Sequence, residues 1–397
     1  MLTLHQSPTD PAFVQDPYPF YARARAQGPL FHWADYGMPA AVSHAAVNAI
    51  LRDRRFGREE PAETRADPPG HLAAFYAVEA HSMLELEPPR HTRLRGLVLR
   101  AFTARRIAAL EPEIAALAHA LIDAFPAGPV DLLPAFAQRI PVIVIARLLG
   151  VPEGMADRLL AWSNAMVGMY QARRIPAMEV AANAAAADFA AFLRGYVEDR
   201  RTRPADDLIT HLIAAEAEGE RLTTDELIST CILLLNAGHE ATVHTMGNGI
   251  RALLRHKTPA EALAPARIAA TVEEILRFDP PLHLFTRWAY EDVTVGGHIF
   301  RRGDRVACLL AAANRDPQVW ERADRFDPAR PEKPNVAFGA GLHFCVGAPL
   351  ARLELQVALP ILFARLPGLR LHGRTRYADL YHFHGLERLV VSRPTGG

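Results

Sequence analysis

The feature that most constrains the fold is a helix-forming segment that runs from Thr223 to about His256. Thr223 and Glu226 have the spacing of a capping box, in which the two residues bond each other's backbone N–H groups at a helix start. The segment can continue as a helix through Leu233, Ala237, His244 and Ile250. At about 1.5 Å per residue such a helix is about 50 Å long. It is long enough to cross a whole domain.

The rest of the chain also has mainly helical patterns. Residues 103–125 and 179–203 are rich in Ala, Leu and Arg, with apolar positions three and four apart. Strand patterns are few: residues 293–300 predict a hairpin that turns at a Gly-Gly pair, and weaker candidates lie near 29–43 and 366–392. The predicted class is mainly α with small β-sheets.

Composition bears on the number of domains, the class of partner and the cell compartment. The prolines are scattered and no repeat is present, so we expect a single integrated domain over residues 1–397. The formal net charge is zero, which argues against nucleic acid or an anionic membrane as the main partner. Three widely spaced cysteines favour a reducing compartment. No signal peptide or apolar run of membrane-spanning length is visible, so we expect a soluble, cytoplasmic protein.

The stretch with the clearest chemistry is 338–354, where glycines surround a single cysteine, Cys345, and a helical pattern follows. Pro349 suits the first turn of that helix, where a missing N–H does no harm. Cys345 therefore lies just before a helix N-terminus, whose partial positive charge favours a thiolate. Three glycines allow the backbone to approach a flat ligand and direct N–H groups at the sulfur: Gly339, Gly341 and Gly347.

Two other interpretations of this loop are weaker. A lone cysteine is most often an ordinary buried side chain, but the glycines, His343 and the trailing helix argue against that here. A dinucleotide-binding loop would need a third glycine where Phe344 stands.

The order Phe338-Gly339-x-Gly341-x-His343-x-Cys345-x-Gly347 resembles the haem-ligand signature of the cytochrome P-450 superfamily in its bacterial form. The resemblance extends from about residue 16 to residue 386. It implies the cytochrome P-450 fold, a single triangular domain, and a haem b (iron protoporphyrin IX) whose iron is held by the Cys345 thiolate. A thiolate ligand donates electron density to haem iron and favours O–O cleavage.

The family also carries a Glu-x-x-Arg pair, which Glu274 and Arg277 match. Side chains at i,i+3 share a helix face and can pair. The family's third partner is an arginine in the loop before the cysteine. Asp324-Arg325-Phe326 resembles its usual setting, so we favour Arg325, with Arg330 as the other candidate.

The resemblance further implies a clamp for the haem propionates. Its members here are Arg287, the pair His91 and Arg95 one helical turn apart, and His343. Buried anions need cationic or hydrogen-bonding partners, which these side chains supply.

On the long helix, Ala237 and Gly238 are expected to leave room for dioxygen, and a stretch of small residues permits a local widening of the helix there. Glu240 matches the family's acidic position, a relay for protons. The family usually places Thr next, whereas this chain has Ala241 followed by Thr242, about 100° further round the helix. That departure bears on proton delivery and not on haem binding.

Two further features are a pair of histidines on the long helix and a proline in the helix after Cys345. His239 and His244 are five apart, not the four that would put two zinc ligands on one helix face, so a zinc site there is rejected. Pro360 lies inside the helix after Cys345 and is expected to kink or interrupt it.

The reaction implied is monooxygenation, in which one atom of O2 enters a small, largely apolar organic substrate. Electrons are expected from NAD(P)H through a ferredoxin or flavodoxin with its reductase, which would dock on a basic patch formed by Arg100, Arg105 and Arg106. Alternatives are a peroxygenase that uses hydrogen peroxide and a non-catalytic haem-thiolate sensor. The expected pocket walls include Phe75, Leu235, Leu282, Leu284, Phe285 and Phe383, with histidines such as His384 at the rim.

Overall fold

The computed structural model describes residues 1–171, 174–217, 220–331 and 333–393. Its α-helices are α1 (Pro11–Gln15), α2 (Tyr18–Ala26), α3 (His44–Arg52), α4 (Ala73–Glu79), α5 (Arg90–Ala101), α6 (Ala104–Ala109), α7 (Glu111–Asp123), α8 (Arg139–Leu149), α9 (Ala156–Val167), α10 (Pro176–Thr202), α11 (Leu208–Ala214), α12 (Thr224–Arg255), α13 (Ile268–Phe278), α14 (Leu310–Ala313) and α15 (Ala348–Arg365). Its strands are β1 (Thr3–Leu4), β2 (Leu30–Trp33), β3 (Met38–Ala41), β4 (Phe56–Gly57), β5 (Val130–Asp131), β6 (Glu216–Ala217), β7 (Glu220–Arg221), β8 (Leu284–Ala289), β9 (Val293–Val295), β10 (His298–Phe300), β11 (Arg305–Leu309), β12 (Arg370–Leu371) and β13 (Val390–Ser392).

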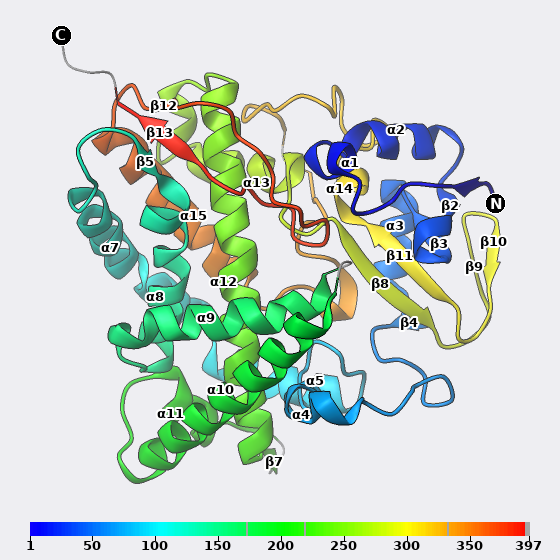
Figure 1. Ribbon diagram of the computed structural model, residues 1–397, viewed down its shortest axis with the longest axis horizontal. Helices are drawn as coiled ribbons and strands as arrows, with labels where there is room; N and C mark the ends of the chain where they lie inside the picture. Colours follow the sequence, from blue (N-terminus) through cyan, green and yellow to red (C-terminus); the bar gives the residue numbers. More distant parts are fainter. Residues whose placement is uncertain (172–173, 218–219, 332, 394–397) are drawn as a thin grey trace.

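The long helix is α12, and it runs through the middle of the molecule (Figure 1). Its predicted capping box is present: the Glu226 N–H donates to the Thr223 hydroxyl at 3.2 Å, and the Thr223 N–H donates to Glu226 at 2.9 Å. The helix packs on α8, α9, α10, α13 and α15. Most of its residues are buried, so it forms the axis of the helical part of the fold.

The strands form small sheets beside the helices. In the described chain, one sheet has the order β1-β2-β3-β11-β8-β4, and another has the order β12-β13-β5. Strands β8 and β11 are antiparallel, with Phe285 opposite Cys308. The predicted hairpin is β9–β10, and both turn glycines have positive φ, Gly296 at 56° and Gly297 at 81°, which a two-residue hairpin turn of this hand requires. The mainly α class with small sheets is confirmed.

Two helix predictions change in detail. The predicted helix 103–125 is divided at Leu110 into α6 and α7, and Pro112 lies in the first turn of α7, where its missing N–H is tolerated. The predicted interruption at Pro360 does not occur, since α15 is continuous from Ala348 to Arg365. Packing against α7 and α13 accompanies that continuity and offsets the lost hydrogen bond.

The buried apolar residues gather mainly around α12, between the helices on its two sides. A second group lies under the larger sheet and includes Val47, Phe300 and Val306, and an aromatic group near the N-terminus includes Phe13, Trp33 and Tyr381. Within the described residues, no helix has the length and apolar character needed to cross a bilayer.

Candidate active site

The cysteine loop lies between Val336 and the start of α15. The Cys345 N–H donates to the Phe338 carbonyl at 3.1 Å, and the Phe344 N–H donates to the Gly341 carbonyl at 3.1 Å, so the loop folds back on itself. Gly341 has a φ of +70°, and a Cβ there would lie 2.3 Å from the Leu51 carbonyl oxygen. Because that neighbour is backbone and cannot move away cheaply, only glycine fits at this position.

The surroundings of the Cys345 sulfur combine opposing influences. Burial raises the pKa of the thiol, whereas the backbone N–H groups of Gly347 and Ala348 and the charges of Arg95 and Arg352 lower it; burial outweighs them. The N–H groups at the start of α15 therefore act as predicted, but they do not alone make a thiolate. A metal cation is the partner that deprotonates such a buried thiol outright.

Several buried donors near this loop lack an anionic partner among the described residues. Arg287 is 2% exposed, its Nη1 donates to the Thr286 carbonyl at 2.8 Å, and it forms no ion pair with a carboxylate of the described residues. Burial and the neighbouring Arg58 lower the pKa of Arg287 to about 10. His91 is 1% exposed and its Nδ1 has no hydrogen-bond partner in the described chain. Groups of this kind fit carboxylates of a bound cofactor.

The other two predicted clamp residues lie close by. The His343 ring is 4.3 Å from the His91 ring, and Arg95 donates from Nη2 to the Phe344 carbonyl at 2.7 Å. His343 already has a partner that the sequence analysis missed: its Nε2 lies 2.8 Å from Glu87 Oε1. Glu87 is far from His343 in the sequence, so no local pattern indicates this pair.

On α12, the Glu240 carboxylate pairs with His244, a partner that was not predicted from the sequence. His244 Nε2 lies 3.0 Å from Glu240 Oε1, one helical turn away. Burial raises the pKa of Glu240, but the hydrogen bond and charge of His244 outweigh that and leave the pKa below its ordinary value. The His244 ring fits only because residue 385 is glycine, since a Cβ there would lie 1.7 Å from His244 Nδ1. The spacing of Glu240 and His244 is the signal that could have predicted the pair.

The next feature is the stretch of small residues on α12 around Gly238 and Ala241. A Cβ at Gly238 would lie 3.4 Å from Ile145 Cδ1, about an ordinary van der Waals contact, so Gly238 lies beside α8. The helix is assigned as α-helix without interruption from Thr224 to Arg255. The Thr242 hydroxyl donates to the Gly238 carbonyl at 2.8 Å, within its own helix. A hydroxyl bonded in this way does not replace one at Ala241.

The predicted Glu274–Arg277 pair is a buried, two-point ion pair on α13. Arg277 Nε and Nη2 donate to the two Glu274 oxygens, both at 2.7 Å. The third arginine is Arg330, whose Nε lies 3.4 Å from Glu274 Oε2. The preference for Arg325 was wrong: its exposed side chain points outward, and only its carbonyl takes part, accepting from Arg277 at 2.9 Å.

The predicted pocket residues belong to different parts of the buried core. Leu235 and Phe75 belong to the helical core, whereas Leu284 packs in the N-terminal aromatic group. Phe285 follows Leu284 in β8 and points to the opposite face of the sheet, where it meets a different cluster. Leu282 pairs with Phe383 through a β-bridge. His384 is 1% exposed and is therefore buried, not at a rim.

Comparison with known proteins adds the decisive observation. The family model described as Cytochrome P450 matches residues 268–367. Vitamin D(3) 25-hydroxylase from Pseudonocardia autotrophica is 41% identical over 394 residues, covering 96% of this chain and 94% of that protein. The chain belongs to the cytochrome P450 family.

Further similarities agree with this. Cytochrome P450 monooxygenase PikC from Streptomyces venezuelae is 37% identical, covering 90% of this chain and 86% of its own. The structure of P450BioI in complex with hexadec-9Z-enoic acid ligated acyl carrier protein aligns with a TM-score of 0.91 at 33% identity, covering 96% of this chain and 99% of that one. This cytochrome P450 is therefore a monooxygenase with a haem cofactor, and the non-catalytic alternative is set aside.

Proposed function

We propose that this cytochrome P450 holds haem b through Cys345 and inserts one oxygen atom from O2 into an apolar organic substrate that carries a polar group. The observation that carries the proposal is the position of Cys345 at the start of α15, with N–H groups of Gly347 and Ala348 and the side chain of Arg95 around its sulfur. We assign haem b from the family resemblance, and haem c is excluded because its covalent attachment uses a Cys-x-x-Cys-His motif, which three distant cysteines cannot form.

The residues of the clamp have one task in this proposal. Arg95 and Arg287 would neutralise the haem propionates, and His91 would donate a hydrogen bond from a neutral ring. Burial and the neighbouring His343 lower the pKa of His91 to about 4, so the ring adds a donor without a further charge. When bound, the haem iron supplies the activation of O2, for which its thiolate ligand provides electron density.

Proton delivery is the task of α12. Glu240 is the acidic group and His244 fixes its orientation, while Ala241 offers no hydroxyl to hold a water molecule. We assign the missing hydrogen-bonding group to the substrate, so that only a correctly bound polar substrate completes the proton path. Relatives support an apolar substrate of this kind, since one is named for hydroxylation of vitamin D(3).

Electrons are proposed to come from NAD(P)H through a ferredoxin or flavodoxin and its reductase. The surface beside Cys345 supports this, because Phe344 of the cysteine loop is 38% exposed and Leu99 on α5 is 47% exposed. Arg100, which follows Leu99, and Arg105 on α6 are both exposed. An apolar centre with basic residues beside it suits an acidic redox protein. Such partners and the buried free thiols Cys231 and Cys308 fit the reducing cytoplasm.

The test is a turnover experiment in an atmosphere of oxygen-18 with NADH, a ferredoxin and its reductase. A substrate is first chosen by its shift of the haem spin state on binding. The product is expected to gain one labelled oxygen atom per molecule. Product that forms with hydrogen peroxide but not with NADH and the electron partners would indicate the peroxygenase, which the absence of a hydroxyl at Ala241 favours as the second candidate.

A further inference from the structure

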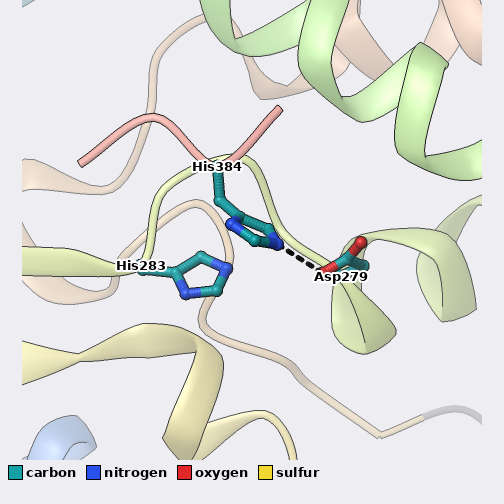
Figure 2. A group of neighbouring side chains, drawn as sticks. All are labelled: Asp279, His283 and His384. Atoms are coloured by element: carbon teal, nitrogen blue, oxygen red, sulfur yellow. Dashed lines mark ion pairs between the residues drawn. The ribbon is translucent and has the colours of Figure 1, made fainter. Parts of the chain in front are cut away.

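Three side chains with metal-binding atoms, to which the proposed function gives no chemical role, meet in the interior. They are Asp279 after α13, His283 just before β8, and His384 in the C-terminal segment. One ligand atom of each lies within 4.8 Å of the other two, and all three residues are buried. Figure 2 shows the side chains converging from two segments, the connection between α13 and β8 and the C-terminal segment, with His384 directed at Asp279.

The ring nitrogens of this cluster are incompletely satisfied. His384 is 1% exposed, and neither of its ring nitrogens has a hydrogen-bond partner in the described chain; its Nε2 lies 3.6 Å from Asp279 Oδ1. His283 is fully buried, and its Nε2 likewise has no partner among the described residues. Buried polar atoms are nearly always bonded to protein, water or an ion, so these nitrogens require an occupant.

The surrounding residues orient the three side chains in the way that outer-shell groups orient metal ligands. The Tyr21 hydroxyl lies 3.0 Å from His283 Nδ1, which leaves Nε2 facing the cluster. Tyr18 donates to Asp279 Oδ1 at 2.7 Å, and the Tyr377 hydroxyl donates to Asp279 Oδ2. Asn248 of α12 donates to the backbone carbonyls of Asp279 and His384, at 3.3 and 2.9 Å.

We propose that Asp279, His283 and His384 bind one divalent transition-metal ion, with Zn²⁺ as the best match. Two imidazole nitrogens and one carboxylate oxygen, with a water molecule in the fourth position, are a donor set that zinc takes in proteins. Burial keeps both rings neutral by lowering the pKa of His283 and of His384 well below the ordinary value, and neutral imidazole is the form that binds metal.

The two nearby arginines have partners other than the proposed ligand atoms. Arg251 donates to the Tyr377 hydroxyl at 2.9 Å, and the Arg315 guanidinium lies over the Tyr18 ring and donates to the Phe278 carbonyl at 2.7 Å. Asp279 thus remains available to a cation. The bound ion would join the end of α13, the entry to β8 and the C-terminal segment, so its role is to stabilise the fold beside α12.

The test measures the zinc-to-iron ratio of the haem-loaded protein after exposure to ZnCl2 and removal of free metal. The haem iron serves as an internal standard. We expect one zinc per iron in the wild type and in His382→Gln, a matched control two residues away in the same segment, and a background ratio in His384→Gln. A background ratio in the wild type overturns the proposal, as does an equal ratio in all three proteins, because zinc would then bind elsewhere.

A second measurement covers the case in which His384→Gln loses its haem. Zinc-edge X-ray absorption of the wild type is expected to show a shell of nitrogen and oxygen ligands with the outer scattering of two imidazoles. A shell containing sulfur, or water alone, overturns the assignment. The X-ray absorption measurement needs neither bound haem nor Cys345, so the zinc site can fail or succeed separately from the proposed function.

Discussion

At Ala241 the chain has a methyl group where the resemblance to the family predicts a hydroxyl. If the substrate supplies the missing group, an analogue without its polar group should still bind but should divert reducing equivalents to hydrogen peroxide. Ala241→Thr is then expected to improve coupling, measured as product formed per NADH consumed, more for the analogue than for the true substrate. Tight coupling of the wild type with the analogue, or a larger gain with the true substrate, would remove the role assigned to Ala241.

Glu240 and His244 allow a prediction about pH. The pKa of Glu240 is depressed in the folded protein, so the carboxylate adds stability that is present at neutral pH and is lost as the pH falls through that depressed pKa. In His244→Ala the hydrogen bond is gone while burial remains, so the pKa rises. We expect a loss of about 1.5–3 kcal/mol in unfolding free energy at neutral pH.

The same variant should shift the pH profile of coupling to higher pH, because Glu240 would stay protonated further up the scale. Denaturant unfolding and the coupling profile are the two measurements. His119→Ala, a change at an exposed histidine on α7, is the control and should leave both unchanged. A profile of His244→Ala that overlays the wild type would show that His244 does not set the state of Glu240.

These residues also show what a sequence can and cannot predict at this scale. Cys345 was identifiable because its neighbours in sequence are its neighbours in space. Glu274 and Arg277 were identifiable for the same reason, since i,i+3 spacing is local. The partner of His343 was not, because Glu87 reaches it only through the packing of α5 against the cysteine loop.

At the scale of elements, α13 is bound to the segment after α14 by side-chain and backbone contacts of two arginines, Arg330 and Arg325. Their contributions to stability can be compared. The Arg330 guanidinium contacts Glu274 and donates to the carbonyls of Arg322 and Arg325, whereas Arg325 contributes only its backbone. Arg330→Ala should lower the unfolding free energy by about 2 kcal/mol or more. Arg325→Ala should change it by about 0.5 kcal/mol or less. Equal losses in denaturant unfolding would contradict this assignment.

Whole elements were predictable where their signals are local. The capping box placed the start of α12, and the glycine pair placed the β9–β10 turn. The break between α6 and α7 was missed because the apolar pattern continues across Leu110. The continuity of α15 was missed because the effect of Pro360 depends on packing against other helices, which the sequence of α15 does not reveal.

On the scale of the whole molecule, the surface around Phe344 and Leu99 should receive the electron donor. Arg106 is a weaker member of the predicted patch, because it contacts His211 and lies 3.6 Å from Asp206. The test therefore uses Arg100→Glu/Arg105→Glu, which should slow electron transfer from an acidic ferredoxin about tenfold or more at low salt, with the difference shrinking as salt increases.

Arg370→Glu is the matched control, since it reverses an exposed charge on β12, which Figure 1 places far from α5. It should leave the rate unchanged. Stopped-flow reduction at several salt concentrations gives the comparison. A rate that is flat from low to high salt, or the same in the double variant as in the wild type, would place the docking surface elsewhere.

The central claim is that the Cys345 sulfur is the haem ligand, and one spectrum tests it most directly. The reduced, carbon-monoxide-bound wild type should show the strongly red-shifted Soret band of thiolate ligation. Cys345→Ala should lose that band even where haem remains bound, while Cys308→Ala, a change at a buried cysteine in β11, should keep it. A Cys345→Ala protein that retains the red-shifted band would contradict the account.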